Sequence, residues 1–396
     1  MAYNPNPRVS FGDSASVDAF SRARVSQNNL LFSSSFIYDK RPLIWSESLT
    51  GAATSTLQVN RASVTLGVTG AGDRAILQTK RYFRYLSGQS QAIFVTFAAI
   101  ALETNVTKRV GYFDDANGLF LEAMGGTLSL VRRSSVTGST VDTAIPQASW
   151  NIDTFDGSGP SGKTLDPTKA QILVIDFQWL GVGRVRMGFD IDGVVYYAHE
   201  FLHANIVDSV YMGSPTLPIR YEISTTGGAG SFEAICSAVS REGGLDDSGI
   251  ITTLQTPLNQ NNATTTLRSI LAVRLRPDHI RGSVLPLSAA VNTASAGFYN
   301  WQLILNPTVA GSFTWANEGV GLQKALDQLV VTEGTGHLVQ AGFVEDDFGT
   351  NPLAALSDLF LSADVDGNAD VLVLAVRNAG GTDDVNGTVT VLEQYT

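Results

Sequence analysis

Two histidines four residues apart, with a glutamate beside the first, form the most specific catalytic pattern in this sequence. The segment His199-Glu200-Phe-Leu-His203 matches the zinc-hydrolase helix, in which both histidines bind the metal and the glutamate acts as the base. The pattern works only on a helix, because in a strand both histidines lie on one side and Glu200 on the other. The Asp192-Gly193 turn and the Val-Val-Tyr-Tyr run after it favour a strand. A zinc hydrolase is therefore the least favoured of three functional hypotheses.

A run of acidic and amide side chains at alternate positions could bind calcium. Asp364, Asp366, Asn368 and Asp370 supply oxygen atoms at the first, third, fifth and seventh positions of a calcium loop. The glycine stands at the fourth position instead of the sixth, and Ala375 occupies the twelfth, where a calcium loop has glutamate. These four residues are weak calcium candidates, a polar turn is the favoured alternative, and no other cofactor is expected.

The polar loop 151–166 and the residue before it offer two further kinds of site. Residues Gly157–Thr164 match the phosphate-binding loop letter by letter, but a proline follows where that loop needs a helix, so we expect an ordinary loop. Sugar sites combine exposed aromatic rings with a few polar side chains. Trp150 is the best exposed aromatic candidate, and Asp153 and Asp156 are weak polar candidates for glycan binding.

The elements that must position these residues are strands, because apolar and polar residues alternate along most of the chain. Residues 171–179 place large apolar side chains on one face and Asp176 on the other. Pairing this run with residues 185–189 as a hairpin sets Asp176 near Arg184 and Arg186 on the solvent side. The pattern predicts an all-β fold of antiparallel sheets, each with one apolar face.

Turn residues and changes in composition divide the chain. Asn117-Gly118, Asp192-Gly193 and Asn386-Gly387 are typical of two-residue hairpin turns. Residues 321–330 carry leucines at helical spacing and predict a short helix. We expect an extended N-terminal arm and two antiparallel β-sandwich domains of jelly-roll or lectin-like type, with these boundaries: arm 1–45, first sandwich 46–245, polar linker 246–268 and second sandwich 269–396.

The composition excludes several classes of protein. The 396 residues include 26 basic and 37 acidic side chains, a net charge of −11, so nucleic-acid binding, which needs clustered Lys and Arg, is excluded. No apolar run approaches the roughly 20 residues that cross a bilayer, and we expect no membrane insertion. The single cysteine, Cys236, excludes an internal disulfide framework, and the N-terminus has no signal-peptide pattern.

Five segments are long enough to carry a family resemblance: Asp18–Ser26, Arg109–Glu122, Ser149–Gly162, Leu165–Gly188 and Ser214–Ile223. They resemble a family of virion-associated proteins of tailed bacteriophages, many of them marine, that also occurs in some large DNA viruses. The resemblance covers most of residues 15–245 and, more loosely, the second half of the chain. It implies a structural component of the virus particle and no catalytic residues.

The leading hypothesis is therefore a non-enzymatic structural protein of a tailed-phage virion, either a capsid decoration or a fibre or tail component. It would be made in the host cytoplasm, assemble as a homo-oligomer and be anchored to other virion proteins by residues 1–45. The alternative is a glycan-binding β-sandwich module that attaches the particle to its host. In both cases we expect no enzyme.

Overall fold

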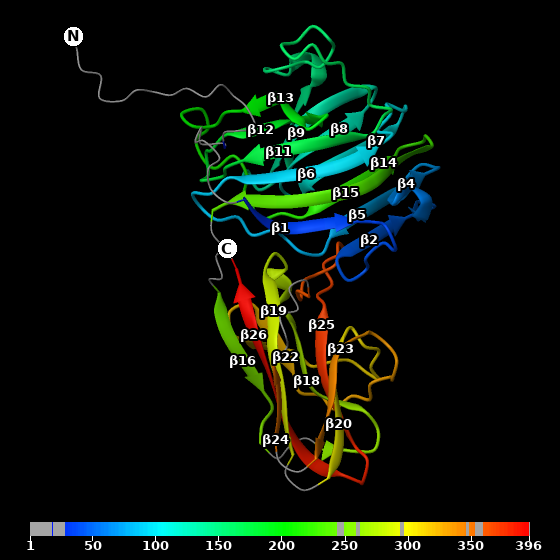
Figure 1. Ribbon diagram of the computed structural model, residues 1–396, viewed down its shortest axis with the longest axis vertical. Coiled ribbons are helices and arrows are strands. Elements are labelled where there is room, and N and C mark those ends of the chain that lie inside the picture. Colours follow the sequence, from blue (N-terminus) through cyan, green and yellow to red (C-terminus); the bar gives the residue numbers. More distant parts are fainter. Residues whose placement is uncertain are drawn as a thin grey trace, which may run out of the picture. The chain divides into compact units, whose positions relative to one another are not determined.

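The computed structural model describes residue 18 and residues 28–243, 249–258, 262–293, 297–345, 348–352 and 359–395. These residues form mainly antiparallel strands (Figure 1), and the helical elements are three short turns, η1 (Val59–Arg61), η2 (Gln147–Ser149) and η3 (Pro277–His279). The expected all-β class is confirmed. Within the described part of the chain, no helix is long and apolar enough to cross a membrane.

The chain divides into two compact units. The first consists of Met1–Thr79 and Phe83–Asp246, and the second of Lys80–Tyr82 and Asp247–Thr396. The short segment Lys80–Tyr82 thus belongs to the second unit although it lies between two strands of the first. Lys80 Nζ is 3.0 Å from Asp370 Oδ1, and the Arg81 guanidinium lies 4.1 Å from the centre of the Phe360 ring.

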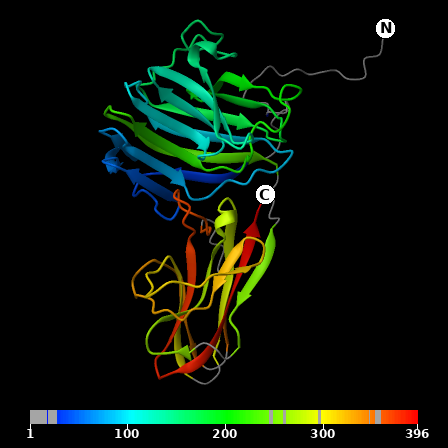
Figure 2. The ribbon, with the colours of Figure 1, turned by 180° about the vertical axis from the view of Figure 1, so that it is seen from behind.

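The first unit is a sandwich of two sheets, seen from both sides in Figures 1 and 2. One sheet has the strand order β13-β12-β11-β6-β15-β4-β3, with β1 paired to β15, and the other has the order β10-β9-β8-β7-β14-β5-β2. The strands are β1 (Asn28–Ser35), β2 (Trp45–Thr50), β3 (Thr54–Gln58), β4 (Ser63–Val68), β5 (Arg74–Thr79), β6 (Gln91–Ala98), β7 (Val106–Phe113), β8 (Gly118–Met124), β9 (Thr127–Ser134), β10 (Val141–Pro146), β11 (Gln171–Phe177), β12 (Val185–Ile191), β13 (Val194–Phe201), β14 (Ile219–Thr225) and β15 (Gly230–Glu242). Inward side chains of both sheets, such as Ile175 and Tyr112, form one buried core.

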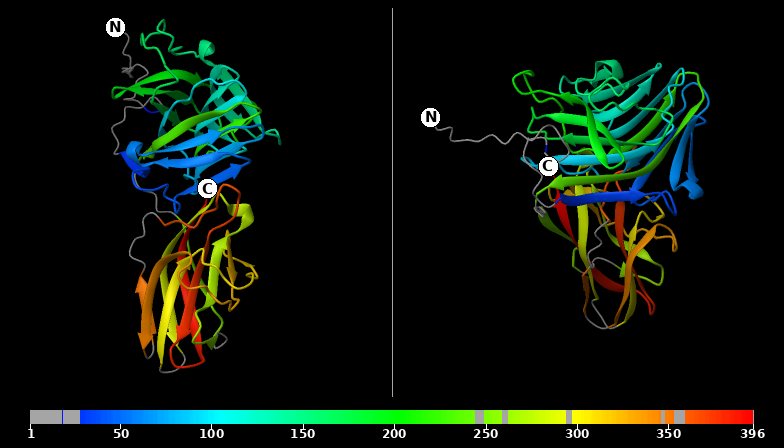
Figure 3. Two further views of the ribbon diagram at one scale, coloured as in Figure 1. Left: turned by 90° about the vertical axis from the view of Figure 1, so that its right-hand side faces the viewer. Right: turned by 45° about the horizontal axis from the view of Figure 1, so that its top comes forward.

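The second unit is a smaller sandwich, and Figure 3 shows it in two further views. Its sheets have the orders β16-β26-β19-β24, with β17 paired to β26, and β21-β22-β18-β25-β20-β23. The strands are β16 (Ile250–Gln255), β17 (Asn262–Ala263), β18 (Arg268–Leu275), β19 (Ser283–Thr293), β20 (Phe298–Leu305), β21 (Ala316–Glu318), β22 (Leu322–Ala325), β23 (His337–Glu345), β24 (Phe348–Pro352), β25 (Val371–Asn378) and β26 (Asp383–Gln394). Trp301 and Leu303 face the core between the sheets. Ile304, on the opposite face of β20, packs instead with Phe313 and Trp315 from the β20–β23 connection.

The predicted hairpin of residues 171–191 is confirmed, including its register, in which Asp176 lies directly opposite Arg186. The Asp192-Gly193 turn between β12 and β13 is also confirmed, with both residues at positive φ. The expected solvent exposure is wrong, because Asp176 and Arg186 are completely buried. Side chains that point away from the apolar face of a strand can therefore still be buried, as Asp176 and Arg186 are.

Two of the predicted boundaries differ from the structure. Within the expected arm 1–45, residues 28–35 form β1, which pairs with β15 and is part of the first unit; residues 1–17 and 19–27 lie outside the described residues. Within the expected linker 246–268, residues 250–255 form β16, which pairs with β26. This edge strand places only Leu254 in the core, while Ile250 and Ile251 are exposed, and the polar residues on either side of it favoured a linker.

The expected short helix over 321–330 is wrong, because residues 322–325 form β22, paired with β18 and β21. Leu322 there faces the core opposite Leu275, so tertiary packing outweighs the helical spacing of the leucines. The two Asn-Gly turns also differ. Asn386-Gly387 lies inside β26, and Asn117-Gly118 ends a longer loop between β7 and β8.

Gly111 of β7 lies against β8 so closely that it has no room for a side chain. A Cβ atom at this position would lie 2.5 Å from the Leu119 carbonyl oxygen and 2.7 Å from the Phe120 Cα. We expect Gly111→Ala to lower the free energy of unfolding by about 1–3 kcal/mol, because the backbone of β8 must move. Chemical denaturation of the full chain measures this. Gly70→Ala is the control, since nothing lies within 4 Å of its added Cβ; equal effects of both variants would contradict the prediction.

Candidate functional site

The zinc hypothesis is wrong, because His199 and Glu200 lie in β13 and not in a helix. The His199 Nδ1 accepts a hydrogen bond from the Asn151 backbone N–H at 3.2 Å. The His203 Nδ1 lies 2.6 Å from the Gly183 carbonyl oxygen. Both histidines are buried, and this burial lowers the pKa of each to about 4. In the described part of the chain, no group of three His, Cys, Asp or Glu side chains could hold a metal ion.

The calcium candidates do not converge on one point. Asp364 Oδ1 accepts hydrogen bonds from the backbone N–H groups of Asp366 and Asn368, at 3.0 and 2.8 Å. Asp370 is buried and instead accepts hydrogen bonds from Lys80 Nζ, at 3.0 Å, and Asn306 Nδ2, at 2.7 Å. The first three residues thus form a turn that bonds to itself, and the fourth is part of the second unit's core.

The expected exposure of Trp150 is wrong, because only 4% of this residue is accessible. Its indole N–H donates to the Ile145 carbonyl oxygen at 3.0 Å, and its ring packs against Phe189. Asp153, also buried, accepts the N–H groups of Phe155 and of Ser161, which fixes the loop. Asp156 is exposed and accepts the Ser158 N–H at 2.8 Å. The three glycan candidates therefore provide no aromatic surface for a sugar.

The outer face of the seven-stranded sheet carries a network of charged groups. We call it the charged face; its members are Arg74, Asp115, Arg109, Glu122, Arg133, Asp142, Arg220 and Glu222. Glu122, Arg109 and Glu222 form one cross-strand row, because Arg109 lies opposite both glutamates. Arg109 Nε donates to Glu122 at 2.7 Å, and its Nη1 donates to Glu222 at 3.1 Å.

Every charge of this face is paired within the protein. Burial alone would raise the pKa of Glu222, but Arg74, Arg220 and Arg109 outweigh it, and the net pKa lies below the ordinary value. The phenyl rings of Phe113 and Phe120 lie beneath the guanidinium groups and are completely buried. The charged groups of this face are therefore satisfied by one another, and the face presents no aromatic ring to a ligand.

An exposed aromatic pair lies on the outer face of the six-stranded sheet in the second unit. Phe298 of β20 and Phe343 of β23 are 48% and 66% accessible, and their ring centroids are 5.1 Å apart with an angle of 19° between the planes. We call them the phenyl pair. Along β20, Tyr299 and Trp301 point into the core, so Phe298 and Asn300, which alternate with them, point outward. Phe343 lies opposite Asn300 on β23 and shares this outer face.

Polar groups border the phenyl pair. Asn300 lies in register between Phe343 on one neighbouring strand and Arg377 on the other, so all three share a face. The Asn300 amide is held on both sides, since its Nδ2 donates to the Gly342 carbonyl oxygen at 3.2 Å and its Oδ1 accepts from Gln302 at 3.1 Å. Arg377 forms an exposed ion pair of 2.8 Å with Glu333. The surface thus combines exposed apolar rings with fixed hydrogen-bonding groups.

The sequence of β20 itself carries a signal for this site. Phe298, Asn300 and Gln302 alternate with the core residues of β20, so a phenyl ring stands on the polar side of the pattern. An aromatic residue at such a position has no place in the core.

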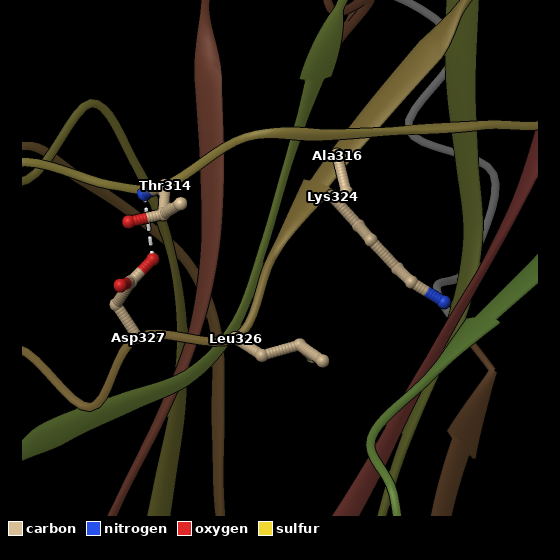
Figure 4. Close-up of a pocket in the computed structure, with 5 residues that line it drawn as sticks. All are labelled: Thr314, Ala316, Lys324, Leu326 and Asp327. Atoms are coloured by element: carbon tan, nitrogen blue, oxygen red, sulfur yellow. Dashed lines mark hydrogen bonds between the residues drawn. The ribbon is translucent and has the colours of Figure 1, made fainter.

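A pocket of about 310 Å³ lies beside β21 and β22 (Figure 4). It is lined by Thr314, Ala316, Lys324, Leu326 and Asp327. Asp327 accepts the Thr314 N–H at 2.7 Å, and Lys324 Nζ lies 2.8 Å from Glu318. Both charged groups of the pocket are therefore already bound within the protein.

No protein-family model matches the sequence, and no curated protein matches it. Several solved structures are similar to about half of this chain. A glycosyl hydrolase family protein from Mycobacterium fortuitum is 12% identical, covers 53% of this chain and 99% of its own length, and has a TM-score of 0.37. The carbohydrate recognition domain of Emp47p is 11% identical, with coverages of 55% and 98% and a TM-score of 0.33. A family 16 endo-glucanase from Bacteroides ovatus is 8% identical, with coverages of 53% and 99% and a TM-score of 0.34.

The likeness concerns the fold, and at these values it says nothing about ligands. It does require one correction. The expectation of no enzyme is corrected, since chains named as glycosyl hydrolases are among the structures that this chain is similar to.

Proposed function

We propose that this chain is a carbohydrate-binding protein that contacts sugar through the phenyl pair. The observation that carries the proposal is the exposure of Phe298 and Phe343 side by side on a sheet face. Exposed apolar surface gains about 25 cal/mol for each Å² that a ligand covers. A pyranose ring has an apolar C–H face that can cover a phenyl ring, and a rim of hydroxyl groups that needs hydrogen-bond partners.

Polar side chains next to the phenyl pair can form hydrogen bonds with the hydroxyl groups of a sugar. The Gln302 amide donates to Asn300 through its Nε2, which leaves its Oε1 to accept from a hydroxyl. The Arg377–Glu333 ion pair offers a donor and an acceptor at one place. Because Asn300 is fixed by two hydrogen bonds, little side-chain freedom is lost on binding.

Substitution of the phenyl pair tests the proposal. We expect Phe298→Ala and Phe343→Ala each to weaken binding to the sugars that the full chain recognises on a glycan array about tenfold, because stacking area is lost. Leu338→Ala is the matched control, since Leu338 is a 53% exposed apolar residue on the same strand as Phe343. A glycan array without a hit, or phenylalanine variants that bind like the control, would sink the proposal.

The resemblance to tailed-phage virion proteins supports a second proposal, that the protein acts on a virus particle and assembles there with copies of itself. A carbohydrate site would then serve attachment to the host. The copy number of the chain in purified particles tests this: a high number indicates capsid decoration, and a low number indicates a tail or fibre. Absence of the chain from the particles would refute it.

A further inference from the structure

Arg274 differs from the arginines of the charged face because no carboxylate pairs with it. It lies in β18 on the outer face of the six-stranded sheet, opposite Gln323 of β22 and Val371 of β25. Among the described residues, no Asp or Glu oxygen is within 4.0 Å of its guanidinium, and its Nη atoms have no hydrogen-bond partner. Although the chain has a net charge of −11, this guanidinium can bind an anion from outside the protein.

The guanidinium is nevertheless held firmly in place. Its Cζ lies 4.2 Å from the centre of the Trp315 ring, and its Nε donates to Gln323 Oε1 at 2.9 Å. Gln323 in turn donates to Asn317 Oδ1 at 3.0 Å. Stacking and hydrogen bonding thus fix the plane of the guanidinium and leave its terminal nitrogens unused, which is the arrangement that binds a planar carboxylate with two parallel hydrogen bonds.

The neighbouring charged groups are used elsewhere. Arg276, directly after the end of β18, forms an ion pair with Asp278, and Lys324 forms one with Glu318. Burial lowers the pKa of Arg274, and no acidic neighbour offsets this. The side chain therefore pays a desolvation cost that a bound anion would reduce.

We propose that Arg274, stacked on Trp315, binds the carboxylate of an acidic saccharide. The saccharide class follows from Asn317, whose Nδ2 has no partner in the described part of the chain and can bond a neighbouring hydroxyl. This inference rests on the proposed carbohydrate binding and adds a second contact to it. The two contacts are separate: between Arg377, beside the phenyl pair, and Val371, beside Arg274, β25 rises about 20 Å.

The test uses the full chain on an array of glycans that end in a uronic or sialic acid, each beside its neutral methyl ester. We expect the acids to bind more tightly than the esters, and Arg274→Gln to weaken binding of the acids about 10- to 100-fold, the value of a charged hydrogen-bond pair. The esters should bind the variant and the unchanged protein equally. Binding of the acids should also weaken as salt is added.

Arg276→Gln is the matched control, since that arginine follows the end of β18 directly and already has Asp278 as a partner. Arg274→Lys keeps the charge without the fork and should recover only part of the affinity. Thermal unfolding of each variant shows that it is folded. Equal binding of acids and esters would overturn this inference alone, and the carbohydrate proposal would stand. An array without any bound sugar would overturn both.

Discussion

Replacing Asp176 by leucine is expected to lower the free energy of unfolding by about 3–5 kcal/mol, one of the two largest effects we predict. Asp176 and Arg186 form a completely buried ion pair on adjacent strands, and Ser90 and Tyr197 donate hydrogen bonds to the same carboxylate at 2.8 and 3.0 Å. Removing the carboxylate breaks this buried ion pair, and the cost of breaking a buried ion pair dominates the effect.

A double-mutant cycle separates the interaction energy of the Asp176–Arg186 pair from the cost of burying each charge. The variant Asp176→Leu/Arg186→Met removes both charges and should recover most of the stability lost by Asp176→Leu, because the two members of the ion pair are removed together. Chemical denaturation of the full chain, followed by tryptophan fluorescence, measures Asp176→Leu, Arg186→Met and the double variant. If the double variant is as unstable as the sum of the single ones, the pair has no coupling and the interpretation fails.

Acid is expected to destabilise the first unit well before its carboxylates are protonated. His199 and His203 have pKa values lowered to about 4 by burial, whereas an unfolded histidine has its ordinary value of 6.5. The unfolded chain therefore takes up protons between these values and the folded chain does not. The stability from each histidine is complete above the unfolded pKa, is lost as the pH falls toward 4, and amounts to about 3 kcal/mol.

Burial lowers the pKa of His199, and its hydrogen bond also disfavours a proton on Nδ1. Its Nδ1 accepts the Asn151 N–H, so a proton on this atom would break the hydrogen bond and place two donors against each other. Denaturation curves recorded between pH 7 and pH 4 measure the loss. In His199→Asn, whose Oδ1 can accept the same bond, the decline with pH should be about half as steep. An equal decline in the variant would show that other groups cause it.

The fold class and local pairing could be predicted because both follow from alternation. The hairpin of β11 and β12 shows this most clearly, since its apolar face and the Asp192-Gly193 turn fix one register. Alternation does not tell what covers the outer face of a sheet. Asp176 and Arg186 stand at outward positions and are nonetheless buried, because burial there depends on distant parts of the chain.

The candidate sites were mispredicted for the same reason, because local sequence patterns do not show which distant residues cover a side chain. Trp150 adjoins a polar loop, which suggested exposure, yet that loop folds back and leaves the indole against Phe189. The histidine motif does not form a metal site because His199 and Glu200 lie in a strand and not in a helix. The pair of Phe298 and Phe343 needed the β20–β23 register, and Arg274 on Trp315 needed the path of the β20–β23 connection. The alternation of apolar and polar residues along one strand gives no information about contacts between residues that are distant in sequence.

The short segment Lys80–Tyr82 has a consequence for how this protein could be inherited or engineered. It belongs to the second unit, and it supplies the lysine that pairs with buried Asp370. A gene fragment that starts after residue 246 would therefore encode a second sandwich without this cation. The two units are not interchangeable cassettes, because exchange at a single crossover point would separate Asp370 from its partner.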